Sequence, residues 1–392
     1  MLRFALRSVL RRPGRTAGTA AVVAVCVTAL ATRHSITEAI ERFTHEAVVE
    51  TRTGAVVVRP PGGFDEVPLG APPTLSPDLV AAVTKQAPAV AARLYVGALL
   101  SDAKTETPVV VRGVDPTLEP VVCPRFSREL RAGGTWLSGD AQGVVGFALA
   151  DALGLGVGQT VTLSSTGTTR ANALELKVVS ISESGLALEN RRVITVPLRL
   201  AQQLAGIEGV SELGIATDGD PAKLRDALAA QLGGSAEVRT WQDVHPLARD
   251  TVERQHRLDL FATLVLLSVV LTALLALGLL AVDERVREVG TLMSFGMRRS
   301  QIAAMFFFEG VLLGALGAAA GLALTAAVTG WLGARGIQVP HMGAAHPAVL
   351  RPALSLVTVA WGSALALVAS ACTGALVAWR VTRLRPIEAA RR

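Results

Sequence analysis

Residue types that can do chemistry are present in this sequence, but they do not form a catalytic or metal-binding pattern. Cys26, Cys123 and Cys372 lie far apart and offer neither a disulfide framework nor a CxxC spacing. His341 and His346 share a loop without a third ligand close in sequence. We therefore expect no metal site and no cofactor bound by this chain.

Motifs for hydrolysis are also absent from the sequence, which has no GxSxG, no HExxH and no paired carboxylates. A phosphate-binding loop needs Gly-Lys before Ser or Thr, and no lysine here follows a glycine. The chain therefore does not hydrolyse ATP by that route. A membrane-anchored enzyme is the least favoured of the functions considered.

Charged residues are concentrated instead in a short connector, residues 283–299, which reads DERVREVGTLMSFGMRR and joins two long apolar runs. Such a connector is suited to be an elbow on which another protein pushes. The alternative is a plain solvated connector that only fixes the orientation of its neighbours.

Four apolar runs are long enough to cross a bilayer, whose core of about 30 Å needs roughly 20 helical residues. They are Thr16–Thr32, Leu258–Val282, Ile302–Leu332 and Ala353–Trp379. The overall hydrophobic content of 51% agrees with a membrane protein. The sequence thus predicts an α-helical membrane protein with four transmembrane helices.

The first run is preceded by an amphipathic segment. Leucine, alanine and valine recur at helical spacing over residues 2–10, while Arg3, Arg7 and Arg11 share the other face. A cleaved signal peptide is the alternative, because Ala29-Leu30-Ala31 resembles a cleavage site. Signal peptides seldom carry such a helix, so we favour an uncleaved span.

Orientation follows from the excess of arginine on the cytoplasmic side. The N-terminus, the connector and the C-terminus are all arginine-rich, whereas the 331–352 loop has only Arg335 and Arg351. We expect both termini in the cytoplasm of a multi-pass cell-membrane protein. Residues 1–33 then form the first span, 34–257 an extracytoplasmic domain, and 258–392 the last three spans with a coupling helix near 284–300.

The extracytoplasmic domain is predicted to be mixed α/β, in two lobes. The segment Pro60–Pro73 is predicted to be a loop or hairpin tip. Short β-branched segments predict strands at Ala55–Arg59, Pro108–Gly113, Thr160–Ser164, Leu174–Ile181 and Val193–Val196. Helical patterns cover Leu149–Leu155, Leu198–Leu204 and Pro221–Leu232.

The net charge of +6 does not indicate nucleic-acid binding, because no basic stripe is interleaved with aromatic residues. No partner of that class is expected.

Several segments together resemble the FtsX-like/MacB-like permease family of ABC transporters, which includes the lipoprotein-release permeases. The resemblance extends over nearly the whole chain. The matching segments are LRSVLRRPGRTAGTAAVV at the N-terminus, Gly113-Val114-Asp115-Pro116, GGTWLSGD, LADALGLGVGQTV, Val238-Arg239-Thr240-Trp241 and, near the C-terminus, RLRPIEA.

The most specific match is the connector. The family pattern E-R-x-x-E-[IV]-G-x-L-R-A-x-G is met by Glu284, Arg285, Glu288, Val289, Gly290, Leu292 and Gly296. Met293 and Ser294 replace the usual Arg and Ala, so the identity of the partner is not carried over. The resemblance implies that these seven residues form an ATPase-coupling helix.

The third apolar run contains two features of its own. Gly310, Gly314, Gly317 and Gly321 fall on one helical face, which predicts close packing against another helix, in this chain or across a dimer. The alternative is that these glycines have no packing role, because glycine is frequent in transmembrane helices. Glu309 lies about two turns into the run, and we expect it to pair with Arg298 or Arg299 rather than to relay protons.

The resemblance implies a permease that works as a dimer, with a second copy or a sister permease, and with cytoplasmic ATPases that bind ATP and Mg²⁺. It further implies mechanotransmission: ATPase closure moves the extracytoplasmic domains to export or extract a lipophilic cargo such as a lipoprotein. The alternative is a signalling protein that activates an extracytoplasmic cell-wall hydrolase, although a domain of this size favours transport.

Overall fold

A computed structural model describes residues 13–64, 72–102, 105–131, 133–166, 171–184, 187–339 and 348–382. The predicted amphipathic segment of residues 2–12, the two loop histidines His341 and His346, and the RLRPIEA segment lie outside them. The chain divides into two compact units. We call residues 1–40, 253–337 and 350–392 the helical unit, and residues 41–252 with 338–349 the globular domain.

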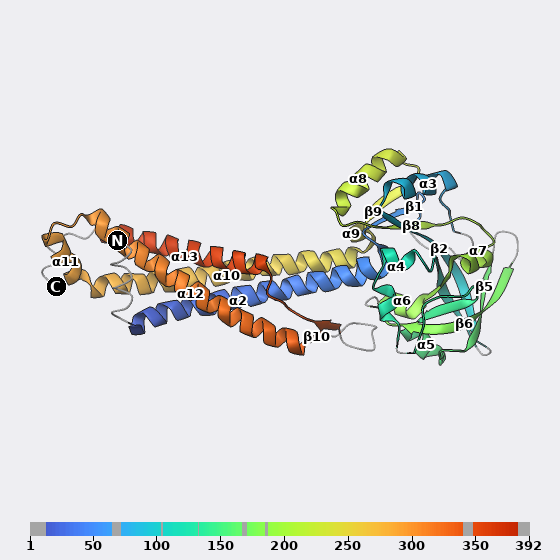
Figure 1. Ribbon diagram of the computed structural model, residues 1–392, viewed down its shortest axis with the longest axis horizontal. Coiled ribbons are helices and arrows are strands. Elements are labelled where there is room, and N and C mark those ends of the chain that lie inside the picture. Colours follow the sequence, from blue (N-terminus) through green and yellow to red (C-terminus); the bar gives the residue numbers. More distant parts are fainter. Residues whose placement is uncertain are drawn as a thin grey trace. The chain divides into compact units, whose positions relative to one another are not determined.

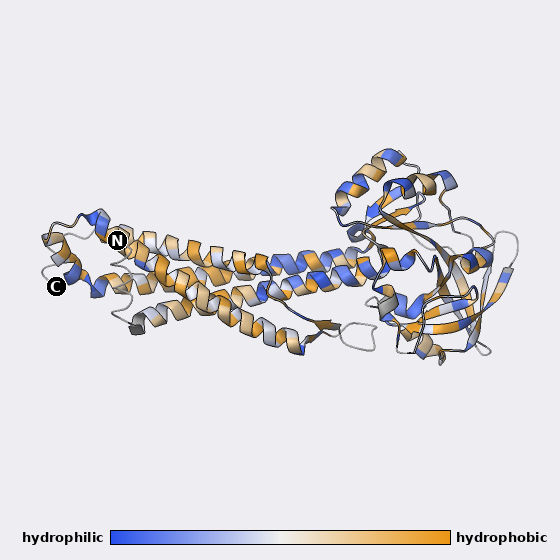
Figure 2. Cartoon of the chain, viewed as in Figure 1, coloured by the Kyte–Doolittle hydropathy of each residue, from blue (hydrophilic) through white to orange (hydrophobic). Residues whose placement is uncertain are grey.

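Four helices are long and apolar enough to cross a membrane, as the sequence predicts. Figure 1 shows them, and Figure 2 shows hydrophobic residues along each. Two of these helices are much longer than the predicted apolar runs. The first helix continues with polar turns after its run, and the second helix begins with polar turns before its run. Their bounds are α2 Pro13–Val48, α10 Pro246–Glu284, α12 Arg299–Arg335 and α13 Leu356–Thr382.

All four helices contribute to one buried cluster in the helical unit. Val27 of α2, Leu274 of α10, Ala318 of α12 and Ala366 of α13 belong to it. Small side chains on α12 and α13 allow close approach, as membrane helices without a hydrophobic driving force between them require.

The glycine face of α12 lies against two different helices of the same chain. A Cβ atom on Gly310 would lie 3.4 Å from the Cα atom of Gly374 in α13, and one on Gly314 would overlap the Ser370 hydroxyl. A Cβ on Gly317 would lie 2.8 Å from the carbonyl oxygen of Ala20, and one on Gly321 would lie 2.7 Å from that of Ala24. Both carbonyls belong to α2. The packing partners in the structure are therefore within this chain.

The globular domain is built on one nine-stranded sheet, in the order β3-β7-β4-β6-β5-β2-β8-β1-β9. Because β2 also pairs with β3, the first six strands close into a ring, and β8, β1 and β9 extend from β2. The strands are β1 Val56–Arg59, β2 Ala89–Asp102, β3 Thr105–Val114, β4 Gln142–Gly146, β5 Thr160–Thr166, β6 Ala171–Ser182, β7 Val193–Pro197, β8 Glu212–Ala216 and β9 Glu237–Thr240. A separate pair joins β10 Ile337–Val339 to β11 Ala348–Leu350.

The two largest hydrophobic clusters of the described domain lie in different parts of the sheet. The ring encloses one core, which includes Leu100, Leu163 and Ile194 and is covered by α7. The other core lies under the β1–β8–β9 extension and includes Leu213 and Leu228. The helices of the domain are α3 Pro77–Gln86, α4 Glu119–Val122, α5 Phe147–Leu153, α6 Ala187–Arg192, α7 Leu198–Ala205, α8 Pro221–Leu232 and α9 Trp241–Val244, with the short 3₁₀-helix η2 Phe126–Glu129.

The five predicted strands and three predicted helices of the domain are all confirmed, as β1, β3, β5, β6, β7, α5, α7 and α8. The long strand β2 was missed, because its alternating pattern is interrupted by alanines and by a buried arginine, Arg93. The predicted loop begins with turns at residues 61–64, and residues 65–71 lie outside the described residues.

Candidate functional site

The connector between spans two and three folds into its own short helix, α11 Val286–Ser294. Arg285 interrupts the helical path of α10 with φ −110° and ψ 14°. On the other side, Gly296 has φ 85°, a conformation that side-chain-bearing residues rarely adopt. These two residues make the elbow a separate helix rather than a continuation of either span.

One face of α11 packs against the ends of the spans. Val289 is almost fully buried in a cluster that includes Val282, Ile302 and Phe306, and Leu292 packs against the same cluster. This face therefore belongs to the core of the helical unit. Val289 and Leu292, two members of the predicted coupling set, fix the elbow in place.

The opposite face of α11 is open to solvent. Glu284 and Glu288 are exposed, and Phe295 just after the helix has 87% of its surface exposed. A large aromatic side chain that packs against so little of its own chain is available to another molecule. Sequence reasoning passed over Phe295, because the family pattern leaves its position unspecified.

A buried ion pair joins the elbow to the third span. The Arg285 guanidinium donates from Nη1 to Oε2 of Glu309 over 3.0 Å, and both side chains are more than 90% buried. Glu309 thus forms a structural ion pair with Arg285 of the elbow, and its predicted pairing with Arg298 or Arg299 stays a prediction. Arg285 and Glu309 were assigned to separate sets from the sequence, and the structure brings them together.

A small cavity adjoins this pair. Its volume is about 60 Å³, and its walls include Glu309, Gly310, Gly314 and the hydroxyl-bearing Ser370 and Thr373. These residues belong to α12 and α13, which approach each other at Gly310 and Gly374.

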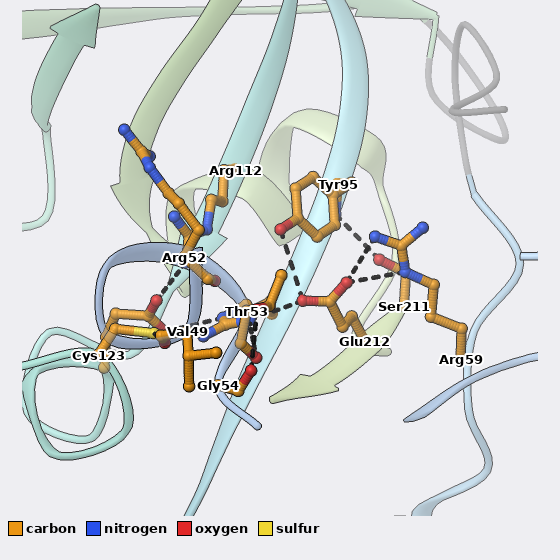
Figure 3. Close-up of polar contacts among 12 residues, drawn as sticks. Val49, Arg52, Thr53, Gly54, Arg59, Tyr95, Arg112, Cys123, Ser211 and Glu212 are labelled. Atoms are coloured by element: carbon orange, nitrogen blue, oxygen red, sulfur yellow. Dashed lines mark hydrogen bonds and ion pairs between the residues drawn. The ribbon is translucent and has the colours of Figure 1, made fainter. Parts of the chain in front are cut away.

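A second buried cluster of charges lies in the globular domain (Figure 3). Arg93 of β2 donates from Nε to Glu119 over 2.9 Å and from Nη1 to Glu212 over 2.7 Å. Arg112 of β3 contacts the other oxygen of Glu119, and Arg59 of β1 donates from Nε to Glu212 over 2.7 Å. Four strands, β1, β2, β3 and β8, and the helix α4 therefore meet through five charged side chains.

The electrostatics of this cluster keep Glu212 ionised near neutral pH. Burial disfavours the charged form of Glu212, but Arg59 and Arg93 outweigh that cost and lower its pKa to about 2. Burial raises the pKa of Tyr95 to about 12 and that of Cys123 to about 11, so both stay neutral. An inert thiol and a neutral phenol complete a structural cluster, not a reactive one.

This domain cluster escaped sequence reasoning, although a signal for it exists. Arg93 stands in AVAARLYVG and Arg112 in VVVRGV, each within an apolar strand where a charge must be paired. Among the residues that the structure describes, no group of three His, Cys, Asp or Glu could hold a metal ion.

Comparison with known proteins covers both units. A family model described as MacB-like periplasmic core domain matches residues 16–233, and one described as FtsX-like permease C-terminal matches residues 260–386. The macrolide export ATP-binding/permease protein MacB of Nitrobacter winogradskyi is 28% identical over 224 residues. That match covers 55% of this chain and 32% of the relative, so the chain spans about a third of the length of that relative.

Two solved structures are similar to part of this chain. The extracellular domain of the noncanonic ABC-type transporter YknZ from Gram-positive bacteria has 14% identity and a TM-score of 0.32, covering 43% of this chain and 90% of that one. The periplasmic region of MacB from Actinobacillus actinomycetemcomitans has 12% identity and a TM-score of 0.34, covering 52% and 94%.

Proposed function

Because the chain belongs to the MacB/FtsX-type family of ABC transporter permeases, we propose that it is the membrane subunit through which a separate cytoplasmic ATPase drives its extracytoplasmic domain. ATP and Mg²⁺ are bound by that ATPase, and this chain contributes no cofactor site. The chain acts as a dimer, with a second copy or a sister permease.

The observation that carries the proposal is the two-faced elbow α11. Its inner face is fastened to span three by Val289 and by the Arg285–Glu309 pair, so a push on the elbow is delivered to the helices. Its outer face offers Glu288 and the exposed Phe295 to a partner. An aromatic anchor beside a charged rim is the usual composition of an energetically important protein contact.

A lipophilic cargo, such as a lipoprotein, is the substrate class that we propose for export or extraction. The support comes from the absence of a catalytic constellation in the sequence and from the size of the globular domain, residues 41–252. What the domain binds is tested by cross-linking the full chain in native membranes and identifying captured molecules. Lipid-modified protein supports the cargo assignment, whereas a cell-wall hydrolase would replace it with the signalling role.

The coupling assignment is tested by Glu288→Arg and Gly296→Trp. The first reverses a charge on the exposed face, and the second places a bulky residue where φ is 85°. Both are expected to abolish ATPase association in detergent while membrane insertion stays intact. Glu208→Arg, a charge reversal on an exposed residue of the globular domain, is the control. Normal ATPase binding and stimulation by both elbow variants would show the assignment to be wrong.

A further inference from the structure

The first transmembrane helix does not end in a flexible linker but in the buried charge cluster of the globular domain. After Val48, helix α2 continues as one turn of π-helix, η1 Val49–Thr53, whose members are mostly buried. It stops at Gly54, where φ is 75° and an added Cβ would lie 2.8 Å from the carbonyl oxygen of Ile215. Only glycine fits this turn, so the chain passes directly from the helix into strand β1.

Arginine side chains of the sheet cap the free carbonyl groups at this helix end. Arg112 donates from Nη2 to the carbonyl oxygen of Arg52 over 2.9 Å (Figure 3). Arg93 donates from Nη1 to the carbonyl oxygen of Thr53 over 3.1 Å. The last carbonyls of a helix lack partners within the helix and carry partial negative charge. Buried guanidinium groups therefore satisfy them where water is excluded.

The charges of the cluster do not balance without the helix end. Within the part of the chain that the structure describes, the ion pairs of Arg59, Arg93 and Arg112 involve two carboxylates, those of Glu119 and Glu212. An unpaired buried cation is costly, so the excess positive charge needs a compensating group. The two helix carbonyls supply partial negative charge at that place, which accounts for the third arginine.

The position of Arg93 connects this cap to both parts of the sheet. Residues Ala89–Arg93 of β2 pair with β8, and residues Arg93–Asp102 pair with β3 in the closed ring. Arg93 thus stands where β2 passes from one set of pairings to the other. A displacement of the helix end acts on the longest strand of the domain at its branch point.

The return connection of the domain has a different construction. Strand β9 leads into the four-residue helix α9, and the chain breaks at His245, with φ −120° and ψ 73°, before α10 begins at Pro246. The cap on this side is the local box formed by Thr240 and Asp243. Among the described residues, no buried arginine of the sheet caps the α9–α10 connection.

We propose that Arg112 and Arg93, by capping the end of α2–η1, make this helix and the central strands β2 and β3 one mechanical body. Movement of the first span then enters the domain through α2. This inference rests on the proposed function, because it assigns the path by which ATPase-driven motion reaches the domain.

A matched pair of substitutions isolates the cap. Arg112→Met and Arg59→Met each remove one guanidinium and leave two arginines facing two glutamates, but only Arg112 contacts the helix end. Hydrogen exchange is followed by mass spectrometry on the full chain in lipid nanodiscs. Arg112→Met is expected to speed exchange at residues 49–55 by about tenfold or more, because a buried acceptor loses its charged donor. Arg59→Met should change exchange there less than about twofold.

The same effect of both variants on residues 49–55, or no effect of Arg112→Met, overturns the capping role. If Arg112→Met does not insert into the membrane, hydrogen exchange of the wild-type chain tests the proposal instead. If the helix end and the strands move as one body, residues 49–55 should exchange as slowly as β2 and β3. Their exchange rates should also respond equally to denaturant. Exchange more than about tenfold faster than in those strands contradicts the proposal.

Transmission is tested on the chain purified with its associated ATPase, by adding ATP and orthovanadate. We expect altered exchange in β2 and β3 for the wild type and for Arg59→Met, but not for Arg112→Met, while α11 responds in all three. A domain response retained in Arg112→Met refutes this path and leaves the proposed function standing. A wild-type chain without any domain response refutes the proposed function, whatever the capping measurement shows.

Discussion

The elbow and the end of helix α2 are both held by buried arginines, but the two clusters are built differently. At the elbow the side chain of Arg285 pairs with the carboxylate of Glu309. In the globular domain three arginines meet two carboxylates, and the excess charge faces the helix carbonyls of Arg52 and Thr53. The first is a clamp between side chains, and the second includes the backbone of a helix end.

This difference indicates what each cluster can hold. An ion pair between side chains can separate if the arginine reaches solvent or lipid head groups, since long cationic side chains extend easily toward an interface. A cluster that satisfies backbone groups cannot separate without uncovering buried carbonyls. We therefore expect the elbow to be the adjustable contact and the domain junction to be the stiff one.

The largest expected effect comes from Glu212→Gln. This change leaves three buried guanidinium groups with one carboxylate, and we expect the domain to lose about 3–5 kcal/mol of stability. The free energy of opening of β2 and β8, measured by hydrogen exchange on the full chain, checks this value. Glu208→Gln at an exposed site should cost less than about 0.5 kcal/mol. A loss of similar size in both variants would contradict the role given to the cluster.

A smaller effect is expected from Glu309→Gln, because Arg285 can move toward the interface once its partner is neutral. We expect the packing of α11 to weaken by about 1–3 kcal/mol, seen as faster exchange in residues 286–294. Glu284→Gln, at an exposed neighbouring site, is the matched control. If Glu309→Gln matched the loss seen for Glu212→Gln, the contrast between an adjustable and a stiff contact would fail.

The pH dependence of the domain junction sharpens the comparison further. Burial raises the pKa of Glu129, beside Thr51 of η1, from 4.5 to about 7, against the opposing charge of Arg52. Between these values the unfolded chain has lost the proton and the folded domain has kept it. The free energy of unfolding therefore falls by roughly 1–3 kcal/mol in total as the pH rises from about 4.5 to 7. Above that range this contribution no longer changes.

Glu129→Gln removes this contribution, so the difference in stability between wild type and variant should grow across the same pH range. Subtracting the two curves cancels the titration of His245, whose pKa burial lowers, and of Glu212, which acts between about 2 and 4.5. A difference that stays constant from pH 4.5 to 7 would contradict the assignment. The exchange of α11 should show no matching dependence on Glu129.

The smallest effect on stability is expected from Phe295→Ala, because 87% of this side chain is exposed. The change in unfolding free energy should stay within about 0.5 kcal/mol, while the affinity for the ATPase falls about tenfold or more if Phe295 is an anchor. Leu247→Ala, with 82% exposure in the globular domain, is the control. An unchanged affinity would remove Phe295 from the coupling surface.

Sequence patterns predicted the helices and strands in which hydrophobic residues recur with one regular spacing. The β-branched run at residues 193–196 became β7, and Pro221 begins α8 after the capping residue Asp220. Strand β2 was missed because its burial on both sides, with Arg93 inside, hides the alternation on which strand prediction depends.

The sequence by itself determined the four apolar helices, their charged elbow and the family of the protein, because hydropathy, charge and motif spacing are local properties of a chain. Only the tertiary structure decided that Arg285 pairs with Glu309 and that Arg93 joins Glu119 to Glu212. Those partners stand 24, 26 and 119 positions apart. A buried charge dictates that a partner must exist, but folding brings the particular partner within reach.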